Sequence, residues 1–490
     1  MGVKFEFESI PELPRLALAA RVRKDDPAIQ VMHGPWVETR EDCFFEGAWD
    51  GPFEEGRFDQ AETFAGSGGR IIDDGIVFSG PSHTFERLFA IRAGDEFHLS
   101  NSLAFVLAAS GERLDPDYRH YYVNFLDFNR DGIRTKQKRL RLEGPRCMEL
   151  HDCCNVMVEP DLTTTRLERA LGPPPRNYSG YFSFLTRTLE GVLANAAHSN
   201  RRQTYQPVTQ LSQGYDSVAV SALASRAGCR ESVSFRKSNS VRGYEHDSGR
   251  EIARYLELRL TEFERTDYHK LGEQRGDEFY IEPDGIDRYM VLMEPQLSGS
   301  VLLTGRFGER LWEIEKFRRF GLPGDTGNPD FQLPTGFRLG GCSMGEFRLR
   351  TGFLHFPVPC AGGLHAPAIR AISESEEMKP WSVGGGYDRP IARRIAEEAG
   401  VPRHLFGQLK KGGPCRWERR SWAGRVAYSA WEAAYWPPLR LLTLRLTGNV
   451  LNPAWRRGSL DVQRRLERIR ERYVAAMAGV ASSRQLAKGI

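Results

Sequence analysis

The sequence lacks the marks of a membrane or secreted protein. A membrane-spanning helix needs roughly 18 or more consecutive apolar residues. The densest apolar stretch, residues 427–446, is interrupted by a Pro-Pro pair and two arginines. The first residues, MGVKFEFESIPELPR, contain no uninterrupted apolar segment of the kind that signal peptides carry. We therefore expect a cytoplasmic protein without a membrane span.

Cysteine and net charge are both low. The chain has 8 cysteines among 490 residues, too few for a disulfide scaffold, and no two of them form the C-x-x-C pair typical of zinc sites. The 68 basic and 64 acidic residues leave a net charge of +4. This balance gives no argument for nucleic acid or an acidic membrane surface as a partner.

Chain length and the pattern of elements predict two domains. A chain of 490 residues exceeds one ordinary hydrophobic core. In residues 1–170, short alternating apolar runs are separated by Gly, Asp, Asn and Ser, which predicts β-structure. The proline-rich segment 171–180 marks the boundary. Over 181–490, strands alternate with helical segments, which predicts a second, α/β domain with a parallel, doubly wound sheet.

The C-terminal region is predicted to be helical and rich in arginine. Within residues 459–479, one apolar face is formed at helical spacing by Val462, Leu466, Ile469, Tyr473 and Met477. The rest of this segment carries Arg464, Arg465, Arg468 and Arg472. An ordinary solvated helix face explains these arginines, and a strip that binds RNA or a protein partner is the alternative.

Residues 207–225, PVTQLSQGYDSVAVSALAS, join an apolar strand to a small-residue helix through a polar turn. Such a turn is a natural anion site, because its backbone N–H groups and the helix N-terminus both favour negative charge. Ser212 and Ser217 can donate to phosphate oxygens, and Gly214 allows close approach of the backbone. Asp216 would repel a phosphate unless a cation lies between them, so the turn predicts pyrophosphate with Mg²⁺. The alternative is a plain polar turn with an Asp or Ser helix cap.

The heptapeptide LSQGYDS, residues 211–217, resembles the S-G-G-x-D-S pyrophosphate loop of the asparagine synthetase-like ATP pyrophosphatases. Four further segments resemble motifs of that family in the same order. They are ESVSF (231–235), HDSGREIARYLEL (246–258), VLLTGRFGERLW (301–312) and YDRPIARRIAEEAGVPRHLFGQLKKGG (387–413). The resemblance covers residues 181–415 and implies a PP-loop domain that binds ATP.

Residues 1–170 resemble the Ntn-hydrolase-like αββα sandwich that serves as the glutaminase domain of the same family. There the nucleophile is a cysteine at position 1 after removal of Met, whereas Gly2 stands here and the first cysteine is Cys43. The resemblance is therefore to members such as β-lactam and carbapenam synthetases, in which this domain is a scaffold without glutaminase activity. We expect Cys43, Cys147, Cys153 and Cys154 to be buried apolar filler.

The resemblance also implies a set of site residues. ATP and pyrophosphate would contact Leu211, Ser212, Gln213, Gly214, Asp216, Ser217, Ser234, Phe235, Thr304 and Gly305. Asp216 and Glu309 match the two carboxylates that hold Mg²⁺. Lys410, with Lys411 as the substitute, matches the lysine that neutralises charge on the phosphate and the intermediate. The expected catalytic group is Lys410, Glu309 and Arg306.

Two positions depart from the family pattern. Gln213 replaces the first glycine of the loop, which keeps the backbone N–H but adds a side chain near the pyrophosphate. Arg306 stands where the family has a Glu or Tyr that takes part in proton transfer, and arginine cannot accept a proton near neutral pH. Glu245, His246 and Asp247 are candidate replacement bases.

A further polar block contains Glu346, Arg348 and Arg350. These side chains either line a pocket for the acceptor substrate or form a salt-bridge network between the domains. The sequence leaves both interpretations open.

Taken with the resemblance, these features predict an ATP-dependent amide ligase. It would adenylate a small-molecule carboxylate, release pyrophosphate, and transfer the acyl group to an amine or to free ammonia as AMP leaves. One alternative is a non-catalytic nucleotide-binding or scaffold paralogue, suggested by Gln213 and Arg306. Another is a PP-loop enzyme that acts on RNA. The sequence does not decide whether the chain forms a homodimer.

Overall fold

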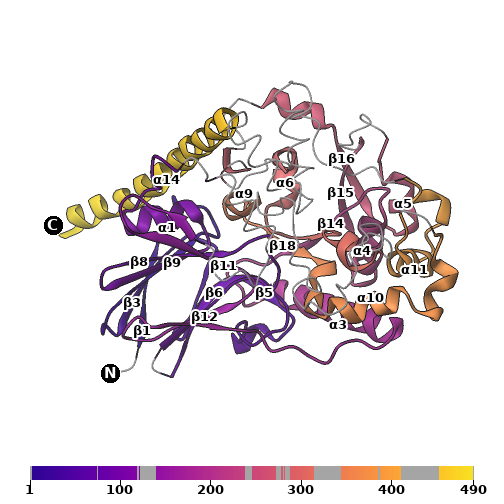
Figure 1. Cartoon of the computed structure of the whole chain (residues 1–490), viewed down its shortest axis with the longest axis horizontal. Coiled ribbons are helices and arrows are strands. Elements are labelled where there is room, and N and C mark those ends of the chain that lie inside the picture. Colours follow the sequence, from indigo (N-terminus) through magenta and orange to yellow (C-terminus); the bar gives the residue numbers. More distant parts are fainter. Residues whose placement is uncertain are drawn as a thin grey trace.

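The computed structural model describes residues 3–73, 75–118, 121, 139–237, 246–271, 277–279, 281, 287–313, 344–384, 387–409 and 452–488. Within these residues the chain is a mixed α/β protein with three sheets (Figure 1). Two of the sheets come from residues 4–167 and the third from residues 206–357. The mixed α/β class predicted from the sequence is confirmed at this level.

The first sheet has 7 strands in the order β1-β3-β2-β9-β8-β11-β10. Their bounds are β1 Lys4–Ser9, β2 Leu18–Arg23, β3 Ala28–His33, β8 Leu88–Ala93, β9 Glu96–Ser100, β10 Arg139–Arg141 and β11 Cys147–His151. The pair β1 and β3 is parallel, and the other neighbouring strands are antiparallel.

The second sheet has 6 strands in the order β13-β12-β7-β6-β5-β4, all antiparallel. Their bounds are β4 Glu38–Thr39, β5 Cys43–Trp49, β6 Phe64–Ile72, β7 Gly75–Ser79, β12 Asn155–Val158 and β13 Thr164–Leu167. The first third of the chain is therefore mostly β, as the alternating apolar runs predicted.

These two sheets share one hydrophobic core. Side chains alternate between the two faces of a strand, so each sheet can turn one apolar row toward the other. Leu18 and Leu99 come from the seven-stranded sheet and Phe44 and Phe78 from the six-stranded sheet, and all are buried in the same cluster. The two sheets thus pack against each other through this cluster.

Helices cover the outer faces of the two sheets. Helix α1 (Leu103–Ser110) and helix α14 (Asn452–Lys488) lie against the seven-stranded sheet (Figure 1). Helix α1 begins where the Ser102 side chain accepts a hydrogen bond from the N–H of Phe105, and ends at Gly111 with φ 72°. Helix α3 (Tyr178–Ala196) contacts β5 of the six-stranded sheet.

The third sheet is parallel and places the candidate site. Its 5 strands run in the order β16-β15-β14-β17-β18. Their bounds are β14 Gln206–Gln210, β15 Glu231–Phe235, β16 Arg259–Phe263, β17 Ser300–Thr304 and β18 Leu354–Pro357. The chain moves outward from β14 to β16 and then returns to β17 on the other side of β14. Such a reversal of strand order is where parallel sheets bind their ligands, beyond the carboxyl ends of the strands.

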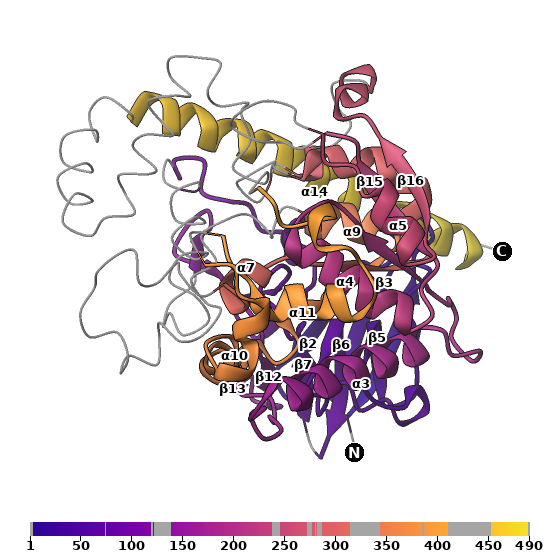
Figure 2. The same ribbon diagram turned by 90° about the vertical axis from the view of Figure 1, so that its right-hand side faces the viewer.

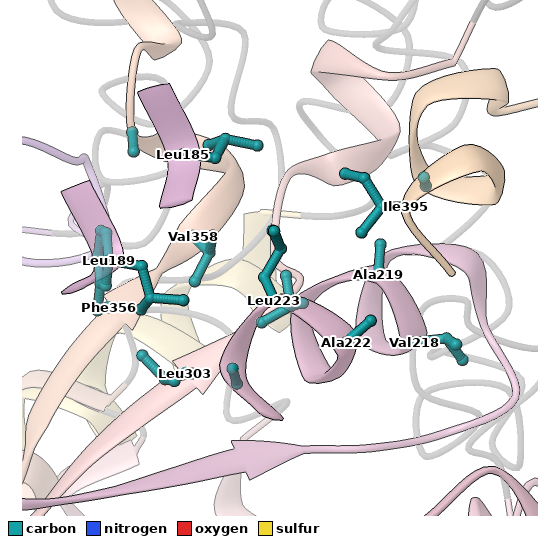
Figure 3. Close-up of a cluster of buried hydrophobic side chains, with 14 of the residues drawn as sticks. Leu185, Leu189, Val218, Ala219, Ala222, Leu223, Leu303, Phe356, Val358 and Ile395 are labelled. Carbon is teal, nitrogen blue, oxygen red and sulfur yellow. The ribbon is translucent and has the colours of Figure 1, made fainter. Parts of the chain in front are cut away.

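Both faces of the parallel sheet are covered by apolar side chains. On one face, helix α4 (Tyr215–Arg226) and helix α11 (Pro390–Glu398) pack with α3 against β17 and β18 (Figures 2 and 3). Leu223 and Leu303 are among the side chains of this cluster (Figure 3). The opposite face buries Leu302 with Phe347 of helix α9 (Gly345–Thr351).

The alternation of strands and helices predicted beyond residue 181 is confirmed as far as the end of β17 at Thr304. Helix α5 (Arg250–Tyr255) takes Gly249 as its N-cap residue. The hydroxyl of Ser248 accepts a hydrogen bond from the N–H of Arg250 at 3.2 Å, so it satisfies one N–H of the first turn.

Helix α14 confirms the apolar face predicted for the C-terminal region. Val462, Leu466, Ile469 and Tyr473 are buried against α1, and Met477 is half-buried. Two of the arginines are ion-paired, because Arg465 and Arg468 both contact Asp277. Among the described residues, no helix has both the length and the apolar character needed to cross a membrane.

Candidate functional site

The loop between β14 and α4 is closed by its own serine side chains. The hydroxyls of Ser212 and Ser217 lie 2.8 Å apart, and the N–H of Gly214 donates to Ser212 Oγ at 3.2 Å. The N–H of Ser212 donates in turn to Ser217 Oγ at 3.2 Å. Gly214 has φ −79°, a conformation open to any residue, so the glycine is not required by the backbone. The two serines therefore hold the shape of the turn predicted to bind pyrophosphate.

Gln213 is tied to the segment that precedes α5. Its backbone N–H donates to Asp247 Oδ1 at 3.2 Å, and its side-chain Nε2 donates to the carbonyl of Ser248 at 3.2 Å. Its carbonyl accepts from the N–H of Gly407 at 2.9 Å. The side chain that replaces the family glycine thus connects the loop to a neighbouring element. A carboxylate, that of Asp247, already accepts from an N–H of this anion-type turn.

Asp216 lies in the first turn of α4 and contacts a buried arginine. Arg389, just before α11, has a side chain only 1% exposed and pairs with Asp216. Its Nε and Nη2 also donate to Glu313 Oε2, at 3.0 and 2.6 Å. Burial lowers the pKa of Arg389, but Asp216, Tyr387, Glu309 and Glu313 raise it above its usual range. Three carboxylates therefore act on one guanidinium at the N-terminus of α4.

The loop after β17 packs directly on Asp216. A Cβ added to Gly305 would lie 2.5 Å from the backbone carbon of Asp216, and a Cβ on Gly308 would overlap the Asp216 carboxyl group. Gly308 begins helix α7 (Gly308–Leu311), whose first turn carries Glu309. The two loops at the reversal of strand order thus meet at Asp216, and only glycine allows that approach.

Arg306 lies in the same loop and contacts other elements. It forms an ion pair with Asp287, the N-cap residue of the short helix η4 (Arg288–Met293). Its guanidinium carbon also lies 5.6 Å from the ring centre of Phe85. A guanidinium held in this way binds an anion and cannot accept a proton.

A buried chain of polar groups lies beside Arg306. His355 of β18 places Nε2 3.0 Å from Thr304 Oγ1 and Nδ1 3.3 Å from Glu86 Oε1. Glu86 is a further partner of Arg348, whose Nε lies 3.1 Å from its Oε2. Burial raises the pKa of Glu86, but Arg348 and His355 outweigh it and lower the pKa to about 2. Glu86 is therefore ionised at neutral pH.

His83 lies beside these polar groups, and both of its ring nitrogens form hydrogen bonds with backbone atoms. Its Nδ1 accepts from the N–H of Phe85 at 3.3 Å, and its Nε2 lies 3.2 Å from the carbonyl of His355, to which it donates. Burial lowers the pKa of His83 to about 4, although Glu86 offsets part of that effect. This imidazole is neutral at pH 7 and fixes the loop before β8 to β18.

The neutral His83 predicts an acid-sensitive step in stability. Because the unfolded chain binds a proton at the usual pKa of 6.5 and the folded chain only near 4, the stability present above pH 6.5 is lost as pH falls to about 4. We expect His83 to account for about 3 kcal/mol of the free energy of unfolding lost over this window. Urea titrations of wild type and His83→Gln at several pH values measure that share. An equal loss in both proteins would contradict the prediction.

Most predicted nucleotide-contacting residues gather at one edge of the parallel sheet. Leu211, Ser234, Phe235 and Thr304 are buried at or just beyond the carboxyl ends of β14, β15 and β17. Glu309 lies one turn beyond the same edge, in α7. Lys410, Lys411 and Glu245 lie outside the described residues.

The polar block around α9 is an ion-pair network, one of the two interpretations that the sequence left open. Arg348 is fully buried and binds Glu46 of β5 at 2.7 Å, so it is not available to a substrate. Arg350 pairs with Glu278 at 2.8 Å and with Glu294 at 2.6 Å. The Glu346 carboxylate accepts from the hydroxyls of Ser102 and Tyr473 at 2.5 and 3.0 Å, which ties α9 to α1 and α14.

Two of the four cysteines in the first third of the chain are unreactive because they are buried. Cys43 and Cys154 are buried, and burial raises the pKa of each thiol to about 12, so neither is a thiolate at neutral pH. The expectation of burial is wrong for Cys147 and Cys153, which are half-buried because they lie at a strand end and in the turn that follows.

Sequence reasoning missed four residues of this region: Glu86, Asp287, His355 and Arg389. Arg389 stands in a segment that was already assigned to a motif, YDRPIARR, and an arginine directly before a helix-starting proline was a usable signal. The other three carry no local pattern. Neither a known protein-family profile nor any curated protein matches the chain.

Proposed function

We propose that the chain is an ATP-dependent, AMP-forming ligase. It adenylates a small-molecule carboxylate with release of pyrophosphate, and an amine or ammonia then captures the acyl group. The observation that carries this proposal is the meeting of two loops at Asp216, one after β14 and one after β17. Parallel sheets bind nucleotides at such a reversal of strand order, with the phosphates at a helix N-terminus.

The fold assignments belong to the same proposal. Two stacked sheets with helices on their outer faces have the layer order of an Ntn-hydrolase-like αββα sandwich. The parallel sheet with helices on its face has the layer order of a PP-loop domain. The thiol of Cys43 is buried and protonated, which supports the absence of glutaminase activity in residues 1–170.

The residues at the site suit a nucleotide with Mg²⁺. Among the side chains of Asp216, Glu309, Glu313 and Arg389, three are acidic and one is basic. This surplus of negative charge beside a helix N-terminus suits a divalent cation with a bound polyphosphate. Asp216 and Glu309 would hold the ion, which when bound neutralises charge on the triphosphate.

The protein's own groups have separate tasks in this scheme. The serine-closed loop and the first turn of α4 would bind the pyrophosphate portion through backbone N–H groups. Arg389 keeps Asp216 in place, since it binds Glu313 on its other edge. Arg306, fixed by Asp287, would bind a carboxylate or phosphate oxygen and so orient the acyl group.

A non-catalytic nucleotide-binding paralogue is the second candidate. Two contacts favour it: Asp216 is already paired with Arg389, and Asp247 accepts from an N–H of the loop. In that case the chain would bind Mg-ATP without exchange of pyrophosphate. The arginines of α14 give little support to an RNA substrate, because Arg465 and Arg468 are engaged by Asp277.

The exchange of radioactive pyrophosphate into ATP tests the proposal. We expect exchange with at least one member of a panel of amino acids and dicarboxylic acids, and we expect Gly308→Ala to reduce it at least about tenfold, because the added methyl group displaces Asp216. The control is Gly479→Ala in α14, where a Cβ meets nothing within 4 Å. Mg-ATP binding without exchange would support the non-catalytic paralogue, and absence of both would overturn nucleotide binding.

A further inference from the structure

Thr304, His355 and Glu86 form an unbroken hydrogen-bonded line at the carboxyl end of β17. The Thr304 hydroxyl lies 3.0 Å from His355 Nε2, and His355 Nδ1 lies 3.3 Å from Glu86 Oε1. The three residues come from β17, from β18 and from the loop before β8. All are buried, with exposures of 1% for Thr304 and His355 and 7% for Glu86. A hydroxyl, an imidazole and a carboxylate in this order can move a proton away from the hydroxyl.

The chemistry of the neighbours fixes the direction of each hydrogen bond. Glu86 is ionised, because Arg348 lies 3.1 Å from its second oxygen. The His355 Nδ1–H must therefore donate to Glu86, which leaves a lone pair on Nε2 to accept from Thr304. Burial lowers the pKa of His355, although Glu86 raises it in part, so the imidazole is neutral at neutral pH. In this arrangement, His355 Nε2 can accept a proton from the Thr304 hydroxyl.

Other groups near His355 do not compete for this task. His83 uses one ring nitrogen to accept from Phe85 and the other to donate to the His355 carbonyl. Arg306 and Arg348 are cations, and Asp287 is paired with Arg306. The charged and titratable groups that act on His355 are Glu86, His83, Arg348, Arg306 and Asp287.

A metal ion is the competing explanation for this cluster. One ligand atom from each of His83, Glu86 and His355 lies within 4.8 Å of the others, which suits a three-ligand metal site in spacing. However, both ring nitrogens of His83 and of His355 have protein partners, and the Arg348 cation lies beside Glu86. A metal would have to displace these bonds, so the hydrogen-bonded line is the better description.

We propose that Thr304 accepts the proton of the nitrogen nucleophile, and that His355 and Glu86 act through it as positioning residues. This inference rests on the proposed ligase function. The amine nitrogen attacks the acyl carbon of the adenylate and forms the C–N bond, while the C–O bond to AMP breaks and AMP leaves with the electron pair. The nitrogen gives one proton to Thr304 Oγ1, whose own proton passes to His355 Nε2. The resulting imidazolium faces the Glu86 carboxylate, and all protons and charges balance.

Position and chemistry both favour this role. Thr304 is the last residue of β17, at the sheet edge where ligands bind, and it precedes the Gly305–Gly308 loop that packs on Asp216. Of the two residues that flank Gly305, Arg306 cannot take a proton, whereas Thr304 can pass one on. Burial of the line also limits hydrolysis of the acyl-adenylate by bulk water.

The test separates this step from adenylation. The acid that supports pyrophosphate exchange is combined with ammonium chloride, and the ratio of amide formation to exchange is measured between about pH 5 and about pH 8. We expect this ratio to fall about 100-fold in Thr304→Val and His355→Gln, and to stay within about threefold of wild type in Thr304→Ser. Gly479→Ala, where the added Cβ meets nothing within 4 Å, is the control, with a ratio equal to that of wild type. After division by the fraction of ammonia that is unprotonated at each pH, the wild-type ratio should decline below pH 6.5, where His355 begins to take up a proton, and His355→Gln should lose that decline.

Several results would overturn the relay while leaving the ligase intact. They are an unchanged ratio in Thr304→Val, an acid decline that persists in His355→Gln, or a stoichiometric metal ion that metal analysis finds in wild type and not in His355→Gln. Absence of exchange in wild type would instead overturn the ligase function itself. A readout without substrate is NMR of isotope-labelled histidine, which we expect to show His355 protonated on Nδ1. Protonation on Nε2 at neutral pH would contradict the proposed line.

Discussion

Replacement of Arg348 by methionine is expected to lower the free energy of unfolding by about 3–5 kcal/mol, because it leaves buried carboxylates without their cation. The Arg348 side chain is 2% exposed, and its Nη1 and Nη2 donate to Glu46 at 2.7 and 2.8 Å. Its Nε lies 3.1 Å from Glu86, close enough for an ion pair but not aligned for a hydrogen bond. Urea unfolding followed by fluorescence measures the effect.

Arg350→Met is the matched control, two residues further along α9. Arg350 also pairs with two glutamates, of which Glu278 is buried, but the Arg350 side chain is 39% exposed and Glu294 is 29% exposed, so water replaces part of the interaction and the expected loss is smaller, about 1–2 kcal/mol. The triple variant Arg348→Met, Glu46→Gln, Glu86→Gln should recover most of the stability, because it removes the stranded charges. Equal losses in Arg348→Met and Arg350→Met would contradict this account.

The stability loss of Arg348→Met should also depend on pH. Burial raises the pKa of Glu46, and Arg348 offsets this only in part. Without Arg348 the pKa of Glu46 rises further, so the folded protein takes up a proton at a higher pH than the unfolded chain. Protonation then favours the folded state, and the deficit of Arg348→Met relative to wild type should shrink as pH falls toward the usual pKa of 4.5.

Local periodicity was enough to predict much of the fold. The apolar face of α14 and the passage from β14 through a polar turn to α4 both follow from side-chain spacing along one element. The pair formed by Arg348 and Glu46 could not be predicted in that way. The two residues are 302 positions apart, and their contact depends on how α9 packs on β5.

The same contrast between local spacing and contacts of distant residues applies to the candidate site. Ser212, Gly214 and Ser217 are neighbours in sequence, so one loop motif was enough to place them together. The partner of Asp216 is Arg389, which lies 173 positions away and reaches the loop only through the packing of α11 on α4. Gln213 was expected near the pyrophosphate, but its hydrogen bond to Ser248 depends on the turn before α5, which spacing does not predict.

Asp216→Asn is expected to reduce ATP–pyrophosphate exchange at least about 100-fold. Asparagine keeps the size of the side chain and its contact with Gly305 and Gly308, so the two loops can still meet. The change removes the negative charge that would hold Mg²⁺ and that now binds Arg389. With that charge gone, Arg389 keeps Glu313, and its free edge can bind a phosphate directly. ATP binding should therefore weaken less than exchange.

Glu313→Gln distinguishes a direct role of Asp216 from a role through Arg389. Both variants remove one carboxylate from the same buried guanidinium, so their losses of stability should be similar. Only Asp216 lies in the first turn of α4 and against both glycines of the second loop. If Asp216 acts on the nucleotide itself, Glu313→Gln should keep exchange within about tenfold of wild type while Asp216→Asn loses it. If the two variants lose exchange to the same extent, Asp216 serves only to position Arg389, and the guanidinium becomes the group that meets the phosphates.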